Sequence, residues 1–233
     1  MTQIINGELV YNELTRNSNG GTERMARRMI ENIYPDLFKG KQIIFSRVRD
    51  LEPNLKKILY VHDLATDPEV SKLADPEYRA QFEKIVFVSN WQQHTYNMVL
   101  GVPFSQSYVI TNGITRIEYV PRTSFEDRAV KLIYHTTPHR GLRLLVPAVK
   151  YLRDNGFNIE LDVYSSFKAY GWEERDKEYQ DLFEEINQTE GMVNHGFVSN
   201  TEIRDALTKA DIFTYPNIWP ETSCLALIEA MCA

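Results

Sequence analysis

Short apolar runs of strand length alternate along this chain with segments of helical pattern, and this alternation limits the folds open to it. Strands are predicted at residues 42–45, 58–61, 85–88 and 108–110, and again at residues 130–134, 159–164, 192–197 and 211–215. Helices are predicted at residues 22–34, 76–82 and 91–100, then at residues 141–154, 173–187 and 201–210, with a last one starting at Glu221 or Thr222. Such alternation predicts parallel sheets with ligand sites at the carboxyl ends of the strands.

A polar stretch without periodicity interrupts the pattern at residues 116–127. Linkers between domains have this composition, so we place a domain boundary at residues 122–127. The prediction is two α/β domains in tandem, residues 1–125 and 126–233. No repeat of fixed period stands out, which argues against a solenoid.

Composition excludes several classes of protein. The 233 residues carry a formal net charge of −6, which disfavours bulk binding of nucleic acid. No apolar segment is long enough to span a bilayer, and no signal peptide is visible at the start, so we expect a cytoplasmic protein. Cys224 and Cys232 are interpreted as packing residues of a reducing compartment.

The final stretch, residues 211–233, predicts an anion site. A buried strand is followed by a turn with Pro216 and Pro220 and then by a helix. The first amide N–H groups of a helix have no intrahelical partner, and its dipole is positive at that end, so a phosphate suits the place.

Two carboxylates, Glu221 and Glu229, flank that site. Eight residues of helix separate them by about 12 Å along the axis, comparable to the reach of a nucleotide sugar. Ionised carboxylates only accept hydrogen bonds, so they suit sugar hydroxyls. The alternative is that Glu221 is an acid favoured by the helix dipole and Glu229 a solvated helix position.

Three other places have residues suited to binding. Gly20 and Gly21 open a helix, either to let the backbone approach a ligand or simply to form a turn. His62 and Asp63 follow a predicted strand. His62 is a candidate general base or hydrogen-bond donor that Asp63 could orient. The alternative is that His62 caps a neighbouring helix and Asp63 starts a turn.

The third place is the loop after the first strand of the second domain, residues 135–141. It contains histidines, threonines and Arg140 just before a helix, a composition that suits a phosphate. The alternative for Arg140 is a surface residue.

Taken together, these motifs resemble glycosyltransferase family 4. The resemblance runs from about Gly20 to the last residue and rests on Gly-Gly-Thr-Glu at residues 20–23, Val-His-Asp at 61–63, Val-Ser-Asn at 88–90, Thr-Asn-Gly-Ile at 111–114, Arg-Gly-Leu at 140–142, Gly-Phe-Val at 196–198, and the stretch 215–231. It implies the GT-B fold, with two Rossmann-like domains facing a cleft. It also implies transfer of a sugar from a nucleotide-diphosphate sugar, of UDP or GDP type, with retention at the anomeric carbon.

The resemblance assigns roles by motif position. His62, Arg140 and Glu221 would act in catalysis: His62 meets the sugar, Arg140 neutralises the leaving diphosphate and Glu221 contacts sugar hydroxyls. The other donor-binding residues would be Gly20, Gly21, His135, Thr137, Thr222, Ser223, Cys224, Leu225 and, at the ribose, Glu229. No protein nucleophile is implied, because attack from the same face is assisted by the donor phosphate, and no cofactor or metal is required.

Three features depart from the family pattern. His135 stands where the family often has an arginine, the first domain is short, and the chain stops at Ala233 where members continue, so we expect a truncated second domain.

The acceptor would be a glycan, lipid or protein, and peripheral membrane contact stays open. Two alternatives remain: a nucleotide-sugar epimerase or phosphorylase on the same fold, and a catalytically silent nucleotide-binding module.

Overall fold

The computed structural model describes residues 2–11, 18, 20–121, 124, 126 and 128–233, and these form two compact units. Unit 1 comprises Met1–Gly113 and Pro220–Ser223, and unit 2 comprises Ile114–Trp219 and Cys224–Ala233. Residues 122, 123, 125 and 127 of the predicted linker lie outside the described residues. Each unit contains one sheet, as the alternation of strands and helices predicts.

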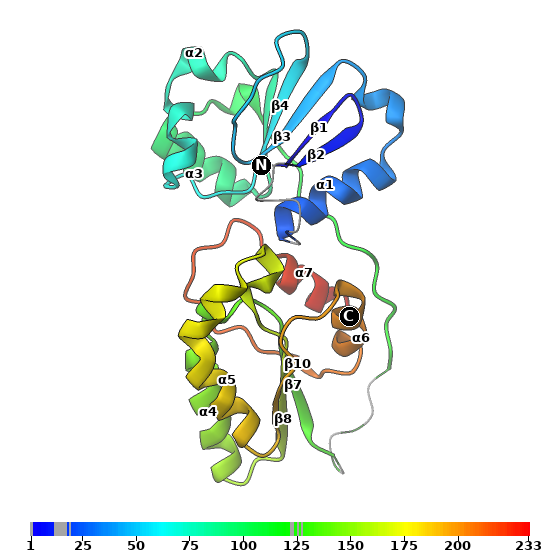
Figure 1. Cartoon of the computed structure of the whole chain (residues 1–233), viewed down its shortest axis with the longest axis vertical. Helices are drawn as coiled ribbons and strands as arrows, with labels where there is room; N and C mark the ends of the chain where they lie inside the picture. Colours follow the sequence, from blue (N-terminus) through cyan, green and yellow to red (C-terminus); the bar gives the residue numbers. More distant parts are fainter. Residues whose placement is uncertain (1, 12–17, 19, 122–123, 125, 127) are drawn as a thin grey trace. The chain divides into compact units, whose positions relative to one another are not determined.

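Unit 1 is built on a six-stranded sheet of order β2-β1-β3-β4-β5-β6 (Figure 1). The strands are β1 (Thr2–Ile5), β2 (Glu8–Tyr11), β3 (Lys41–Phe45), β4 (Lys56–Val61), β5 (Lys84–Phe87) and β6 (Ser107–Val109). The helices are α1 (Gly21–Asn32), α2 (Pro76–Arg79) and α3 (Asn90–Leu100), with 3-10 helices at Pro35–Phe38, Pro68–Ala74 and Phe104–Gln106. β3 to β6 are parallel, as predicted.

The hairpin of β1 and β2 is not among the predicted strands, and it makes the sheet mixed. β1 runs antiparallel to both β2 and β3. Asn6 and Gly7 join the two strands with φ values of 49° and 90°. Asn-Gly between short apolar runs is a strong hairpin signal, because both central residues of a type I′ turn need positive φ.

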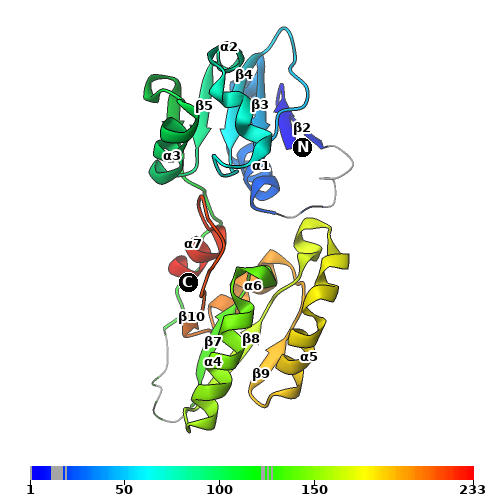
Figure 2. The same cartoon turned by 90° about the vertical axis from the view of Figure 1, so that its left-hand side faces the viewer.

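The sheet of unit 1 is covered on both faces. One face packs residues of β3, β4 and β5, such as Ile44, Leu59 and Phe87, against Leu73 and Tyr96 from the α2–α3 side. On the other face lies α1, whose Met25 and Ala26 are buried (Figure 1, Figure 2). α3 has the predicted ends, with Ser89 as N-cap and left-handed Gly101 after the last turn.

Unit 2 is built on a four-stranded parallel sheet of order β10-β7-β8-β9. The strands are β7 (Val130–Tyr134), β8 (Ile159–Val163), β9 (Met192–Asn194) and β10 (Ile212–Phe213). The helices are α4 (Leu142–Asp154), α5 (Gln180–Gln188), α6 (Asn200–Leu207) and α7 (Leu225–Cys232), with 3-10 helices at Pro138–Arg140, Phe167–Tyr170 and Glu173–Tyr179.

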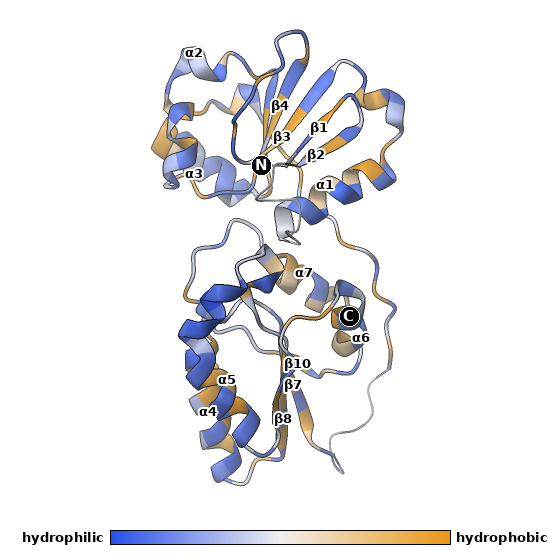
Figure 3. Cartoon of the chain, viewed as in Figure 1, coloured by the Kyte–Doolittle hydropathy of each residue, from blue (hydrophilic) through white to orange (hydrophobic). Residues whose placement is uncertain are grey.

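Two apolar clusters hold unit 2 together, one on each face of the sheet. α4 and α5 bury Val146, Val149 and Ile186 on one face, and Figure 3 shows hydrophobic and hydrophilic residues alternating along these helices. α6 buries Ile203 and Leu207 on the other face. The sheet is therefore shielded from water on both sides, as parallel strands require.

Polar side chains fix the start of α6 and the start of β10 in unit 2. The capping box of Ser199 and Glu202 forms at the start of α6, as predicted. Asp211, before the edge strand β10, has a side chain 1% exposed and pairs with Arg128 at 2.6 Å. Asp211 also accepts the N–H of Lys131 at 2.8 Å, so it ties the start of β10 to the start of β7.

The predicted start of the last helix is wrong. α7 begins at Leu225, with Cys224 as N-cap, rather than at Glu221 or Thr222. Residues 220–223 precede the helix as irregular backbone and belong to unit 1. The separation of about 12 Å between Glu221 and Glu229, which assumed one continuous helix, therefore does not apply.

Candidate functional site

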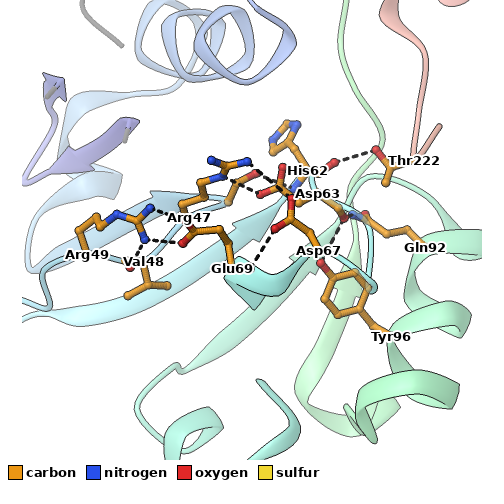
Figure 4. Close-up of polar contacts among 11 residues, drawn as sticks. Arg47, Val48, Arg49, His62, Asp63, Asp67, Glu69, Gln92, Tyr96 and Thr222 are labelled. Carbon is orange, nitrogen blue, oxygen red and sulfur yellow. Dashed lines mark hydrogen bonds and ion pairs between the residues drawn. The ribbon is translucent and has the colours of Figure 1, made fainter. Parts of the chain in front are cut away.

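In unit 1, the carboxyl ends of the parallel strands place several polar groups at one edge of the sheet. Ser46 follows β3, His62 follows β4 and Ser89 comes just after β5. Thr222 lies at the same edge: its Oγ1 donates to the carbonyl of His62 at 2.8 Å (Figure 4). Its own carbonyl accepts from Ser89 Oγ at 2.8 Å. Asn112 Nδ2 donates to the carbonyl of Ser223 at 3.3 Å.

The imidazole of His62 lies among aromatic rings. Its centroid is 4.8 Å from that of Tyr60 and 6.0 Å from that of Phe45. Burial lowers the pKa of His62 to about 4, because the charged form loses its hydration. The buried Nε2 has no hydrogen-bond partner among the described residues. His62 is therefore neutral at pH 7, and its Nε2 is a buried polar atom that no described residue satisfies.

Asp63 does not orient His62. Its carboxylate faces Arg47, with Oδ2 3.7 Å from Nε (Figure 4), and no hydrogen bond between it and the His62 ring occurs among the described residues. Burial raises the pKa of Asp63, and the Arg47 guanidinium opposes that shift. The Asp63 carbonyl accepts from Gln92 Nε2 at 2.8 Å and from the Tyr96 hydroxyl at 3.1 Å, so this residue anchors the strand end to α3.

The glycine pair lies at the start of α1, where Gly20 is the N-cap and Gly21 the first helical residue. Ser18 Oγ accepts the Gly20 N–H at 3.4 Å and donates to the carboxylate of Glu23 at 3.0 Å. Glu23 is buried and also accepts from Thr2 Oγ1. The remaining loop residues, 16, 17 and 19, lie outside the described residues. A buried carboxylate thus holds the described part of the loop in place.

In unit 2, the loop after β7 presents Arg140 from a short 3-10 helix. The Tyr134 hydroxyl donates to the Thr137 carbonyl at 2.9 Å, and Arg140 Nε donates to Thr137 Oγ1 at 3.3 Å. Arg140 Nη1 is also 3.4 Å from the Tyr215 hydroxyl. Burial raises the pKa of Tyr215 strongly, so its hydroxyl stays protonated. Thr137 and Tyr215 therefore hold the Arg140 guanidinium in one position near the carboxyl ends of the strands.

A close backbone approach joins this loop to the segment after β10. Gly141 has φ of 101°, and a Cβ at this position would lie 2.0 Å from the Pro216 carbonyl oxygen. Cys224, the N-cap of α7, forms a side-chain hydrogen bond with Tyr215. Thr137, Arg140, Tyr215 and Cys224 thus form one group at the start of α7, which we call the Arg140 cluster.

Amide groups complete the polar surroundings of the Arg140 cluster. The first intrahelical bond of α7 runs from the Ile228 N–H to the Cys224 carbonyl at 3.1 Å. The amides of Leu225, Ala226 and Leu227 therefore precede any intrahelical acceptor. Of the predicted amide positions, Thr222 to Leu225, only Leu225 belongs to α7. A helix start, a guanidinium and hydroxyl donors together suit an anion.

Other side chains of the same loop lie close to this cluster. The buried Thr136 Oγ1 and His139 Nδ1 have no hydrogen-bond partner among the described residues. The His139 ring stacks on Phe167, with centroids 5.2 Å apart, and meets Trp219 at 4.8 Å. Burial, with Arg140 and Arg175 nearby, lowers the pKa of His139 to about 4. The His135 ring packs 4.9 Å from Phe213.

The paired glutamates belong to different units. Glu221 and the neighbouring Thr222 and Ser223 are part of unit 1, whereas Glu229 on α7 is part of unit 2. Glu229 is 1% exposed, which excludes the alternative of a solvated helix position. Asn200 Nδ2 lies 3.3 and 3.4 Å from its two carboxylate oxygens. A buried carboxylate needs hydrogen-bond donors, and Asn200 provides one of them.

Several residues of these sites were not predicted. Ser46, Asn200 and Tyr215 are not among the candidate residues, and Thr222 was predicted to act through its amide rather than its hydroxyl. Ser46 has φ of 65°, unusual for serine, but no sequence pattern reveals a left-handed serine. Their roles depend on tertiary neighbours that are distant in the sequence.

Within the part of the chain that the structure describes, no group of three or more His, Cys, Asp and Glu residues could hold a metal ion. Across the same described residues, every helix is too short or too polar to cross a membrane.

One family model matches part of the chain. Residues 123–233 match the family described as glycosyl transferases group 1. A comparison of the sequence with curated proteins found no match.

Solved structures share the fold. TarM is similar with a TM-score of 0.58 at 14% identity, over 82% of this chain and 39% of TarM. A glycosyltransferase from Rickettsia africae ESF-5 is similar with a TM-score of 0.58 at 14% identity, over 95% of this chain and 62% of that one. Sucrose-phosphate synthase from Thermosynechococcus elongatus has a TM-score of 0.50 at 17% identity, over 76% of this chain and 48% of that one. The GT-B fold expected from the sequence is confirmed, and this chain spans only part of each of these proteins.

Proposed function

We propose that this protein transfers a sugar from a nucleotide-diphosphate sugar to an acceptor hydroxyl, with retention at the anomeric carbon, because residues 123–233 match the family described as glycosyl transferases group 1. The acceptor is a glycan, a lipid or a protein. In this proposal the Arg140 cluster and Glu229 bind the donor nucleotide, and His62 meets the sugar.

The observation that carries this proposal is the Arg140 cluster. Thr137 and Tyr215 hold the Arg140 guanidinium beside the Cys224 cap of α7. A diphosphate needs a fixed cation and several N–H or O–H donors, and such charge-assisted bonds are about twice as strong as neutral ones. In the transfer step the leaving diphosphate gains negative charge, which Arg140 and the α7 amides stabilise.

The remaining roles follow from burial and charge. Glu229 is a buried carboxylate on α7 and accepts bonds from the ribose hydroxyls. Glu221 accepts from hydroxyls of the donor sugar. His62 is neutral, because its pKa is lowered to about 4. In the proposed reaction it forms a hydrogen bond with a sugar hydroxyl and adds no positive charge beside the oxocarbenium-like sugar. The acceptor oxygen attacks from the face that the diphosphate leaves, and the phosphate takes its proton.

Nucleotide binding tests the proposal first. UDP-, GDP- and ADP-sugars are screened by thermal shift, since a ligand that binds the native state raises the unfolding temperature. We expect one nucleotide class to bind and Arg140→Ala to weaken its affinity by about tenfold or more, because charge-assisted bonds are lost. The matched control is Arg143→Ala, three residues along, where the guanidinium pairs with exposed Asp181. Equal losses in both variants would reject the phosphate assignment.

Two further variants separate the carboxylates. Glu229→Gln should weaken binding of the nucleoside diphosphate but not of inorganic diphosphate, because only the former has a ribose. Glu221→Ala should mainly lower turnover. Equal affinity of wild type and Glu229→Gln for the nucleoside diphosphate would rule out the ribose contact.

Products distinguish transfer from the other reactions on this fold. Incubation of the best-binding donor without acceptor should give slow hydrolysis to sugar and nucleoside diphosphate. Conversion into the epimeric nucleotide sugar would identify an epimerase instead. Nucleotide binding with neither hydrolysis nor transfer would favour a silent binding module.

A further inference from the structure

Two hydroxyl groups hold the backbone of His62 from opposite sides. Its N–H donates to Ser46 Oγ at 3.0 Å, and its carbonyl accepts from Thr222 Oγ1 at 2.8 Å (Figure 4). β4 ends at Val61, one residue earlier, so the ladder with β5 does not extend to His62. The position of this residue therefore depends on side chains, one from the sheet edge and one from the segment 220–223.

The segment that carries Thr222 is itself anchored in unit 1. Ser89 caps α3 through its Oγ, which accepts the Gln92 N–H at 3.1 Å and donates to the Thr222 carbonyl at 2.8 Å. The next carbonyl, that of Ser223, accepts from Asn112 Nδ2. Two bonds to groups that follow β5 and β6 place the backbone at Thr222 and Ser223, so the Thr222 hydroxyl is in a defined position to fix another residue.

A small displacement of His62 has a large chemical effect. The ring fills a space bordered by Tyr60 and Phe45, and the buried Nε2 has no partner among the described residues. A hydrogen bond between this nitrogen and a sugar hydroxyl tolerates only a few tenths of an ångström in distance. Misplacement of a reacting group by about 1 Å costs on the order of a hundredfold in rate.

We propose that Thr222 is a positioning residue for His62: its hydroxyl fixes the His62 carbonyl and thereby the place of the imidazole. This inference rests on the proposed function, in which His62 meets the donor sugar, but the contact itself exists without any ligand. Thr222 acts through its side chain, so its role is distinct from the amide contact to diphosphate expected from the sequence.

A measurement without ligand tests the contact. In the full chain with isotope-labelled histidine, the imidazole resonances of His62, assigned through His62→Gln, are compared among variants. Thr222→Val, which keeps the shape but removes the hydroxyl, should shift the His62 resonance, and Thr222→Ser should restore it. Thr222→Ala takes the place of the valine variant if that protein does not fold. The control is Thr95→Val, which removes the 2.8 Å bond from Thr95 Oγ1 to the Trp91 carbonyl on α3. An unshifted His62 resonance in the variants without the hydroxyl would overturn the proposal.

Turnover then tests whether the contact serves the reaction. With the nucleotide sugar that binds best, Thr222→Val should lower kcat about tenfold with little change in KM, and Thr222→Ser should recover most of it, since positioning acts on the reacting geometry. In a His62→Ala background the same substitution should have no further effect, because residues that act through one another are not additive. An equal loss with and without His62 would overturn the proposal.

The two tests fail separately. If the wild-type protein turns over none of the donors, the proposed function is wrong, and the resonance of His62 still decides whether Thr222 positions the ring.

Discussion

At His62, burial determines the protonation state. The ring loses hydration without gaining a charged partner, which lowers its pKa from 6.5 to about 4. A histidine whose pKa is depressed in the folded protein stabilises that state above pH 6.5, and the stabilisation is lost as the pH falls, because the unfolded chain then binds the extra proton. His139 contributes with the same sign, since its pKa is also lowered to about 4.

We therefore predict that His62→Gln flattens the pH dependence of stability between pH 6.5 and 4. One depressed histidine contributes a slope of about 1.4 kcal/mol for each pH unit in this window. Urea unfolding at several pH values measures the free energy of unfolding, and the variant should lose less stability on acidification than the wild type. Asp63, whose pKa is raised, acts in the opposite direction but is present in both proteins.

The control for this prediction is His94→Gln, on the exposed side of α3. Its slope should match that of the wild type. If His62→Gln and wild type lose stability in parallel from pH 6.5 to 4, the ring is not held neutral by burial.

The two glutamates illustrate what the sequence reveals about single residues. Their motif draws attention to both, and the burial of Glu229 agrees with a specific role for it. The sequence does not reveal their surroundings: Glu221 lies in an irregular segment of unit 1 and Glu229 on a helix of unit 2. Local spacing predicts a distance only when both residues share one element, and here they do not.

Among the elements, the start of α7 shows why local signals fail. Thr222 followed by an apolar run is typical of a helix N-terminus. In the fold, the Thr222 hydroxyl and carbonyl are bonded to His62 and Ser89, so they cannot serve a helix. Tertiary contacts override propensity at this point. The capping box at Ser199 and Glu202 was predictable because all of its bonds are local.

The loop before α4 depends on the absence of a side chain at Gly141. We predict that Gly141→Ala destabilises unit 2 by about 2 kcal/mol or more, because a left-handed φ strains alanine and the new Cβ would overlap the Pro216 carbonyl. The same variant should weaken nucleotide binding, since it pushes the Arg140 loop away from Tyr215. Urea unfolding and calorimetry measure the two effects.

Gly156→Ala is the matched control for that prediction. Gly156 also has a left-handed φ, of 85°, but a Cβ added there would have no other atom within 4 Å. Its cost should be limited to backbone strain of about 1 kcal/mol, with unchanged nucleotide affinity. If both variants lose the same stability, the approach of Pro216 to Gly141 is not important.

For the whole molecule, the alternation of strands and helices predicts the class of fold correctly. Parallel strands are joined by crossovers that usually contain a helix, so alternation predicts parallel order. β3 to β6 and all strands of unit 2 are parallel, although the crossover from β3 to β4 contains no helix. The membership of residues 220–223 in unit 1 could not be predicted, because it depends on contacts with Ser89 and Asn112 more than a hundred residues earlier.

The two units offer separate spectroscopic reporters. Trp91 lies in unit 1, whereas Trp172 and Trp219 lie in unit 2. Each unit has its own apolar core, so each is expected to unfold in its own transition rather than in one two-state step. In variants with phenylalanine at two of the three tryptophan positions, the fluorescence of the remaining tryptophan reports the unfolding of the unit that contains it.

We predict that the nucleoside diphosphate that binds best stabilises unit 2 and leaves unit 1 nearly unchanged. At a concentration of 100 times Kd, the transition reported by Trp172 should gain about 2.7 kcal/mol, because the ligand binds only the folded state. The transition reported by Trp91 should move far less, since Arg140 and Glu229 both belong to unit 2. Arg140→Ala in the Trp172 protein should remove most of the gain at the same nucleotide concentration. Equal gains at Trp91 and Trp172 would mean that the units unfold together or that the nucleotide contacts both.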